Sequence, residues 1–446
     1  MSAGLRRAKA LGLAAVLAGA ASSAAAAPAP APGRTLRFPT PSAVEVGPTR
    51  LIGEADPGAL LSGVAIFIAA GLDRVPAARS GIASLTAECI IRTPVDGVPL
   101  REAVTGRGGS VNYTVDGRSV RYFLEGRSAE LPALVTLLGK ALAAPDFSAA
   151  TVAAARAGLG GKIDQADADP LAVGIQMFRQ AYYAASAGMP ALGTAAGLVQ
   201  LGPPELGAFY AATYKRRAVT ASAVGSAVPQ LAAALRTLAA ALPDGPVAAG
   251  SERANALSAQ APRIVAHRDI AAPWVVLGFA APSPDSPDFG PMLVLESLVA
   301  DAFNRNSATT LGDIEKGVGA VYLYDAKPAG LVVYVNGTIT DPSLALREVL
   351  VVSRSLAAKP VTAAALSRLK SSARGQFLAD ADTLSSRAYL LGAFSAQGLG
   401  DDPINAALAG LERTTPADLQ RVAKRYLQRY IVALVLPRER APGPGR

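Results

Sequence analysis

The chain has 446 residues, which exceeds the size of a single hydrophobic core and fits two domains of about 200 residues each. It carries 43 Lys and Arg against 34 Asp and Glu, for a net charge of +9. The cationic residues are scattered and are not interleaved with aromatic residues, a pattern that argues against a nucleic-acid-binding groove. The only cysteine, Cys89, cannot form an intrachain disulfide, so the fold depends on packing for its stability.

Residues 1–26 have the pattern of a secretory signal peptide, with basic residues at the start, an apolar run over residues 10–21 and small residues at 24–26. The apolar run is shorter than the roughly 20 residues that a membrane-spanning helix needs, and no later segment is both long enough and free of charge. Residues 27–41 are rich in Pro and Ala and are expected to form an extended leader after cleavage. We therefore expect a periplasmic or secreted protein without a membrane span.

Apolar periodicity in the first half predicts a mixture of strands and helices. The predicted elements are a strand over residues 65–71, a helix over 79–91, a pair of strands over 110–125, and helices over 131–143 and 149–157. The glycine-rich segment 158–161 lacks the Lys-Ser/Thr of a phosphate loop and is interpreted as an interruption or end of the last of these helices. This order of elements is typical of an α+β fold.

The second half of the chain repeats the first in outline. Gly109–Tyr113 matches Gly319–Leu323, and Tyr122–Gly126 matches Val333–Gly337, in the same order and with nearly constant spacing. Such internal similarity predicts two duplicated α+β domains joined by a linker. The predicted boundaries are 42–240 for the first domain, 241–262 for the linker, 263–437 for the second domain and 438–446 for a tail.

The predicted helix over residues 79–91 holds the most informative positions. It reads as an ordinary amphipathic helix, and four of its residues are expected to face a core. These are Ile82, Leu85, Cys89 and Ile90. Ser84, Ala87 and Glu88 are spaced i, i+3, i+4 and share another part of the helix surface.

The segment Gly81–Pro94, together with the duplicated plan, resembles the metal-binding helix of pitrilysin/insulinase-type zinc peptidases. In that family a His-x-x-Glu-His motif provides two zinc ligands and a general base. The corresponding positions here are Ser84, Ala87 and Glu88, so both imidazoles are replaced. The only histidine of the chain, His267, lies far downstream and has no Ser or Cys nucleophile frame near it.

The resemblance spans about residues 45–437 and includes the segments 190–194, 201–210 and 415–437. It implies an α+β fold of two homologous mixed α/β-sandwich halves of the pitrilysin/processing-peptidase type. The first half would then contain a degenerate metal site.

Other functional positions of the family are also changed. The third zinc ligand of the family, a Glu, corresponds to Lys162, which places a positive charge where the metal would sit. An Arg and a Tyr that grip the substrate in the second half correspond to Glu315 and Tyr322. The resemblance therefore implies a site without zinc or another cofactor. It leaves Tyr322 as the candidate substrate-binding position, together with Glu315, whose charge is opposite to that of the Arg in the family.

The leading hypothesis is a non-catalytic subunit of an exported zinc peptidase complex. Members of the family enclose an extended peptide between a metal-bearing half and a facing half, and bacterial relatives often divide these roles between two chains. A facing half supplies shape, strand-edge hydrogen bonds and apolar pockets. The expected partners are a zinc-bearing homologous subunit and peptides. Because Glu315 stands where the family has an Arg, its charge is reversed. We therefore expect this chain to act more by scaffolding its partner and shaping the chamber than by stabilising the transition state.

Two alternatives stay open. The first is a stand-alone periplasmic peptide-binding or scaffold protein, monomeric or self-paired, on a peptidase fold that has lost its chemistry. The second is an enzyme in which Glu88, together with Glu102, Asp164 or Asp169, binds a hard cation such as Mg²⁺ or Ca²⁺. Lys162 opposes this second alternative because its charge repels a cation.

Overall fold

The computed structural model describes residues 37–250, 255, 257, 262–310, 317–336 and 342–438. The predicted signal peptide and most of the predicted leader lie outside the described residues. Among the helices within these ranges, none is both long enough and apolar enough to cross a membrane.

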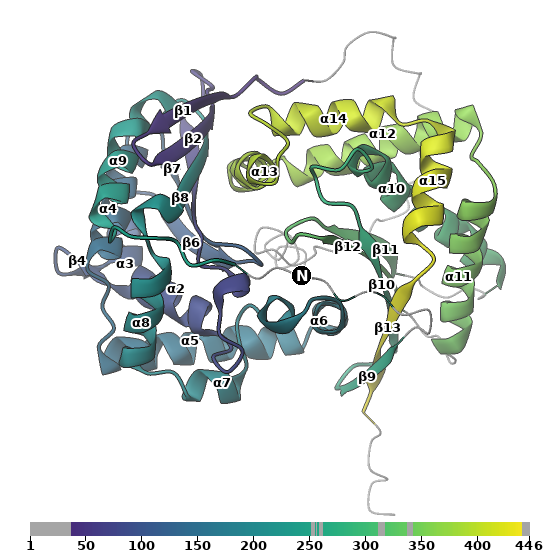
Figure 1. Ribbon diagram of the computed structural model, residues 1–446, viewed down its shortest axis with the longest axis horizontal. Helices are drawn as coiled ribbons and strands as arrows, with labels where there is room; N and C mark the ends of the chain where they lie inside the picture. The colour runs from purple at the N-terminus through teal and green to yellow at the C-terminus, as the bar shows by residue number, and fades with distance from the viewer. Residues whose placement is uncertain are drawn as a thin grey trace, which may run out of the picture.

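The first half is a six-stranded sheet with a layer of helices on its outer face (Figure 1). The strands lie in the order β1-β2-β8-β3-β7-β6. The strands are β1 Ser42–Val46, β2 Thr49–Glu54, β3 Leu61–Ile68, β6 Ser110–Val115, β7 Val120–Arg127 and β8 Val219–Val224, with a small β4 Pro94–Val95 and β5 Val98–Pro99 hairpin outside the sheet. The helices are α2 Ile82–Arg92, α3 Leu100–Gly106, α4 Leu131–Ala143, α5 Ala149–Asp167, α6 Pro170–Tyr182, α7 Ala195–Val199, α8 Pro203–Thr213 and α9 Leu231–Ala241.

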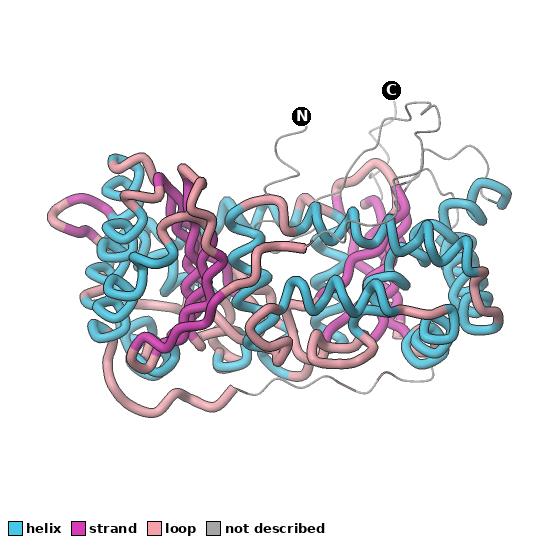
Figure 2. The backbone as a smooth tube through the Cα atoms, turned by 90° about the horizontal axis from the view of Figure 1, so that it is seen from above, coloured by secondary structure: helices cyan, strands magenta, loops and turns pink. Residues whose placement is uncertain are grey.

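The second half is a five-stranded sheet in the order β11-β12-β10-β13-β9. The strands are β9 Arg263–Arg268, β10 Trp274–Ala281, β11 Gly317–Leu323, β12 Ala329–Asn336 and β13 Tyr430–Pro437. The helices are α10 Phe289–Thr310, α11 Pro342–Ala358, α12 Ala363–Asp380, α13 Leu384–Ala396, α14 Pro403–Arg413 and α15 Pro416–Tyr426. Figure 2 shows the two sheets as separate layers, with helices on their outer sides and between them.

The two sheets repeat one topology. In the first sheet β2 is parallel to β8, and the series β8, β3, β7, β6 is antiparallel. In the second sheet β9 is parallel to β13, and the series β13, β10, β12, β11 is antiparallel. Strands β6 and β7 thus correspond to β11 and β12, as the internal sequence match predicts. The predicted fold class, two similar mixed α/β halves, is confirmed.

The halves exchange one helix each (Figure 1). Helix α6 of the first half packs on β10 and β13 of the second sheet, and α13 of the second half packs on β3 and β8 of the first. Both contacts are close: a Cβ added at Gly278 would lie 1.9 Å from the ring of Phe178 in α6, and one added at Gly392 in α13 would lie 2.3 Å from the ring of Phe67. Glycine at these positions lets each helix approach the opposite sheet.

The core is shared between the halves. A cluster of buried apolar residues from the second half continues into four residues of the first sheet, Ala65, Phe67, Phe123 and Val224. Ion pairs also cross the boundary: Arg179 in α6 donates to Asp325 at 2.7 Å, and Arg387 in α13 donates to Glu54 at 3.0 Å. The two halves are therefore held by apolar packing and by buried polar contacts.

Several predicted boundaries differ from the structure. Strand β3 begins at Leu61 because β7 extends to Arg127 and pairs with it there, and α2 begins at Ile82 after Gly81. The predicted break at residues 158–161 is wrong, since α5 continues through this segment to Asp167. Gly158 has a packing role instead: a Cβ there would lie 2.8 Å from an Nη atom of Arg92, so glycine leaves room for that side chain.

Candidate functional site

Helix α2 is held in a tightly packed position beside the first sheet. Its N-cap, Gly81, has φ of 89°, which favours glycine, and an added Cβ would lie 2.7 Å from Leu198. The four residues predicted to face a core are fully buried. Helices α3, α5 and α8 and strand β6 cover the remaining sides, so the whole of residues 82–91 is buried. Positions 84, 87 and 88 therefore lie inside the protein.

Glu88 is the centre of the candidate site. Its side chain is 1% exposed, and its two oxygens accept hydrogen bonds from three other side chains. Lys162 Nζ donates to Oε2 at 2.8 Å, Tyr113 Oη donates to the same oxygen at 2.9 Å, and Arg92 Nε donates to Oε1 at 3.0 Å. A carboxylate that is buried to this degree is stable only with such partners.

The partners determine the protonation state of Glu88. Burial alone would raise the pKa of the Glu88 carboxyl. The hydrogen bond and charge of Lys162, the hydrogen bond of Tyr113 and the charge of Arg92 outweigh this effect and hold the pKa below its ordinary value of 4.5. Burial and the neighbouring Glu88 raise the pKa of Tyr113 well above 10.0, so its hydroxyl stays protonated as a donor. Glu88 is therefore an anion at neutral pH.

Lys162 occupies the position between Glu88 and solvent. Its Nζ lies 4.8 Å from the centroid of the Tyr113 ring, and its side chain is 43% exposed. The ammonium thus combines an ion pair, a cation–π contact and access to water. At the position that the sequence resemblance predicts for the third metal ligand, α2 and α5 meet through an ammonium–carboxylate pair.

Ser84 and Ala87 complete the motif positions. Ser84 Oγ donates to the carbonyl oxygen of Ala191 at 2.6 Å, which ties α2 to the segment after η2 Ala185–Gly188. Ala87 is fully buried and has only a methyl group. Cys89 is also fully buried, and burial raises the pKa of its thiol to about 12, so it packs as an apolar residue.

The residues present do not fit a zinc ion. Zinc sites in proteins use neutral imidazoles, thiolates and carboxylates as ligands. Here a hydroxyl, a methyl group and an ammonium stand at three of the four positions, and the single carboxylate is already bound by two cations and a phenol. Within the part of the chain that the structure describes, no group of three or more His, Cys, Asp or Glu side chains could hold a metal ion.

The carboxylates of the hard-cation alternative do not gather around Glu88. Glu102 and Asp164 are exposed, and Asp169 caps α6 by accepting from the backbone N–H groups of Leu171 and Ala172. Because Lys162, Arg92 and Tyr113 already bond the Glu88 oxygens, the described residues give no support to this alternative.

The second-half position Tyr322 lies in the core. It is 5% exposed, its hydroxyl donates to the carbonyl of Pro282, and its backbone N–H donates to Glu296 at 3.0 Å. Burial raises the pKa of Tyr322 well above 10.0, with the charge of Glu296 adding to the effect. Tyr322 is therefore a protonated, internally bonded side chain in this structure. Glu315 lies outside the described residues.

Sequence reasoning missed two members of the site. Arg92 lies four residues after Glu88 on the same helix, a spacing that permits an ion pair. Tyr113 was placed on a strand, but its contact with a residue 25 positions earlier depends on how β6 lies against α2. The i, i+4 spacing could have identified Arg92, whereas Tyr113 carries no local signal of this contact.

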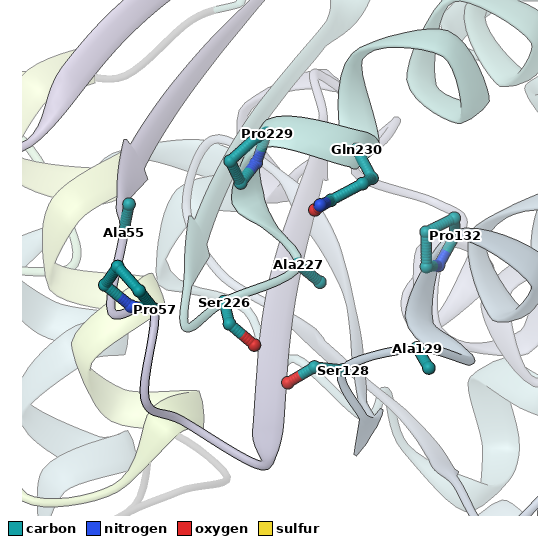
Figure 3. Close-up of a pocket in the computed structure, with 9 residues that line it drawn as sticks. All are labelled: Ala55, Pro57, Ser128, Ala129, Pro132, Ser226, Ala227, Pro229 and Gln230. Carbon is teal, nitrogen blue, oxygen red and sulfur yellow. The ribbon is translucent and has the colours of Figure 1, made fainter.

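A separate shallow pocket of about 490 Å³ lies where β2, β7 and β8 end (Figure 3). Its lining residues are Ala55, Pro57, Ser128, Ala129, Pro132, Ser226, Ala227, Pro229 and Gln230. The hydroxyls of Ser128 and Ser226 both donate to the carbonyl of Ala59. None of the nine lining residues is ionisable, so this pocket offers no acid–base or metal chemistry.

The overall fold matches those of solved structures. A protease from Helicobacter pylori has a TM-score of 0.80 at 15% identity, with 90% of this chain and 100% of that chain covered. A peptidase M16 inactive domain from Pseudomonas fluorescens has a TM-score of 0.76 at 15% identity, covering 91% and 100%. An M16-like protein from Alicyclobacillus acidocaldarius has a TM-score of 0.75 at 14% identity, covering 90% and 99%. The chain has the peptidase M16 fold.

This likeness confirms the fold that the pitrilysin-type resemblance predicts. At 14–15% identity it is a likeness of fold alone. No protein-family model matches the sequence, and no curated protein matches it. What the M16-like fold does in this chain must therefore be inferred from the site.

Proposed function

We propose that this chain is a non-catalytic subunit of an exported, pitrilysin-type zinc peptidase complex. In this proposal a separate homologous subunit carries the zinc, and this chain shapes the chamber and helps to bind the peptide. The M16-like fold supports the family assignment, and the likeness to a domain described as inactive is in keeping with a non-catalytic role. The signal-like residues 1–26 support export.

The observation that carries the proposal is the Glu88–Lys162 pair. An ancestral metal site that had only lost its ligands would leave unpaired polar groups or a cavity. Here the ammonium lies 2.8 Å from the carboxylate, and Arg92 and Tyr113 satisfy the remaining positions. The site is thus rebuilt as a structural contact, and its two cations against one carboxylate repel a metal cation.

The fold offers a surface for a peptide beside this site. Strand β6 is an edge strand of the first sheet, and its Tyr113 contacts Glu88. An extended peptide can add to such an edge through main-chain hydrogen bonds without any metal. This supports a role in positioning peptides for a partner that performs the hydrolysis.

The stand-alone peptide-binding or scaffold protein is the second candidate. The core and ion pairs that join the halves favour it, since they allow the chain to fold as a complete unit without another subunit. The two candidates differ in whether a zinc-bearing homologue accompanies the chain.

Affinity capture separates the two candidates. The tagged mature protein is captured from the native envelope fraction, and mass spectrometry identifies the proteins bound to it. We expect a homologue with an intact His-x-x-Glu-His motif at about one copy per chain, the ratio of a heterodimer. Capture of no such homologue, under conditions that retain other envelope complexes, would favour the stand-alone protein. N-terminal sequencing of the captured chain tests cleavage after residue 26.

A further inference from the structure

Strand β9 forms an uncovered edge of the second sheet. It pairs with β13 on one side, and no strand of the described residues pairs with it on the other. Its counterpart in the first sheet, β2, is covered by β1, which pairs with it antiparallel over its length. The second half has no equivalent of β1 among its described strands, so β9 is an edge strand whereas its counterpart β2 is an inner strand (Figure 1).

The direction of the backbone groups of β9 follows from its bonds to β13. The N–H groups of Val432 and Arg438 donate to the carbonyls of Pro262 and Arg268. In a parallel pair, alternate residues direct both backbone groups to the neighbouring strand. The even-numbered residues of β9 therefore bond to β13. Arg263, Val265 and His267 direct their N–H and C=O groups to the open edge.

The side chains of the same three residues are exposed. Val265 is 46% exposed, and Arg263 and His267 flank it on the same face. Arg268 Nη1 donates to the His267 carbonyl at 3.1 Å, so that acceptor is used, whereas among the described residues the outward N–H and C=O of Val265 have no hydrogen-bond partner. As far as the described residues extend, the edge thus combines outward main-chain groups with an apolar side chain between an arginine and a histidine.

The surroundings of β9 are mainly cationic. Arg429, just before β13, lies at the end where both strands begin, and Arg438, just after β13, lies at the other end. Among the described residues, the acidic side chains next to β9 are Asp167, which lies 3.8 Å from Arg268, and Asp269, which follows the strand. Within the part of the chain that the structure describes, four arginines, at positions 263, 268, 429 and 438, outnumber these two acids. An acidic strand therefore complements this edge, and a second copy of the same basic edge does not.

We propose that the open edge of β9 binds an extended segment of another protein, in which acidic side chains flank an apolar one. The segment adds to the second sheet as its sixth strand. Its main chain bonds to Arg263, to Val265 and to the N–H of His267. One of its acidic side chains pairs with the Arg263 guanidinium and the other accepts a hydrogen bond from the His267 ring, while its apolar side chain covers Val265. This surface is independent of the proposed peptidase partnership, because it requires neither zinc nor the Glu88 region.

A synthetic peptide tests the proposal. The probe is fluorescein-labelled Thr-Glu-Val-Val-Val-Glu-Thr, in which the two glutamates and the central valine share one face of a strand. Its matched control has lysine in place of both glutamates. Fluorescence anisotropy with the full mature chain is expected to show at least tenfold tighter binding of the acidic peptide, and this preference should decrease with added salt. Equal binding of both peptides would overturn the proposal.

Two variants locate the binding surface. Val265→Pro removes one outward N–H and leaves the bonds from Ile264 and Ala266 to β13 intact, so we expect at least a tenfold loss of acidic-peptide binding with an unchanged circular dichroism spectrum. The double variant R263E/H267E keeps every backbone group and should reverse the preference in favour of the lysine peptide. If Val265→Pro does not fold, this double variant tests whether the peptide binds at β9. Unchanged binding by the folded variants would overturn the proposal. So would a dimer in sedimentation velocity that Val265→Pro dissociates, because a second copy would then occupy the edge.

Discussion

Lys162 Nζ lies 2.8 Å from Glu88 Oε2, although 74 positions separate the two residues in the chain. In the pitrilysin-type frame the same two positions would hold a histidine and a glutamate that share a metal ion. Here the ammonium of Lys162 pairs with the Glu88 carboxylate and links α2 to α5. The pair therefore joins two helices of the first half through a buried carboxylate, and its effect on stability can be measured.

Removal of the Glu88 charge should destabilise the protein. Glu88→Gln keeps the size of the side chain but leaves Lys162 and Arg92 without their anionic partner. Because both cations retain access to water, we expect a loss of about 1–3 kcal/mol in the free energy of unfolding, measured by urea denaturation. Glu102→Gln removes an exposed carboxylate and is the matched control, with a change within about 0.5 kcal/mol. Equal effects of the two substitutions would contradict a structural role for the buried pair.

The contribution of Glu88 should depend on pH. Its pKa in the folded protein is lower than the ordinary value of 4.5, so the unfolded chain binds the proton more readily. The stabilisation is therefore complete above about pH 4.5 and decreases as the pH falls through the folded pKa. Urea denaturation of the wild type and of Glu88→Gln at pH 7 and at successively lower pH should show two stabilities that converge in acid. If the difference in stability between the two proteins stayed constant across this pH range, the charge of Glu88 would not be its cause.

A metal site should be recoverable at these positions. The triple variant S84H/E88H/K162E places two imidazoles and a carboxylate where the frame has its ligands, and we expect it to retain about one zinc ion per chain after dialysis. Inductively coupled plasma mass spectrometry measures the metal content. The double variant S84H/E88H keeps the ammonium of Lys162 and should retain much less zinc. If both variants bind zinc equally, position 162 does not face the metal.

The close contact between α6 and the second sheet should tolerate no added methyl group. In Gly278→Ala, the new Cβ would lie 1.9 Å from the ring of the fully buried Phe178, and we expect a loss of about 3 kcal/mol or more in the free energy of unfolding. Gly161→Ala is the matched control, because nothing lies within 4 Å of its added Cβ inside α5. That change should stabilise by about 0.5–1 kcal/mol through helix propensity. Thermal and urea denaturation measure the stability of both variants. A Gly278→Ala variant as stable as the wild type would contradict the close contact between α6 and the second sheet.

Much of the fold could be predicted from local patterns. Alternation in residues 110–125 predicted β6 and β7, the four core-facing residues of α2 are buried as expected, and the repeated segments correspond to equivalent strands of the two sheets. The predicted break in α5 failed for a physical reason. Glycine weakens a helix, but it also makes room for a neighbouring side chain, and the contact of Gly158 with Arg92 cannot be seen in the sequence around it.

The sequence by itself determined that this chain has no pair of imidazoles for a zinc motif and that its two halves share one plan, because composition and residue spacing are local properties. Only the tertiary structure decided that Lys162, Arg92 and Tyr113 converge on Glu88 and that α6 and α13 are exchanged between the halves. These contacts join residues up to 333 positions apart, as in the pair of Arg387 with Glu54. They arise when apolar faces are buried against one another, and that packing selects which distant polar groups meet.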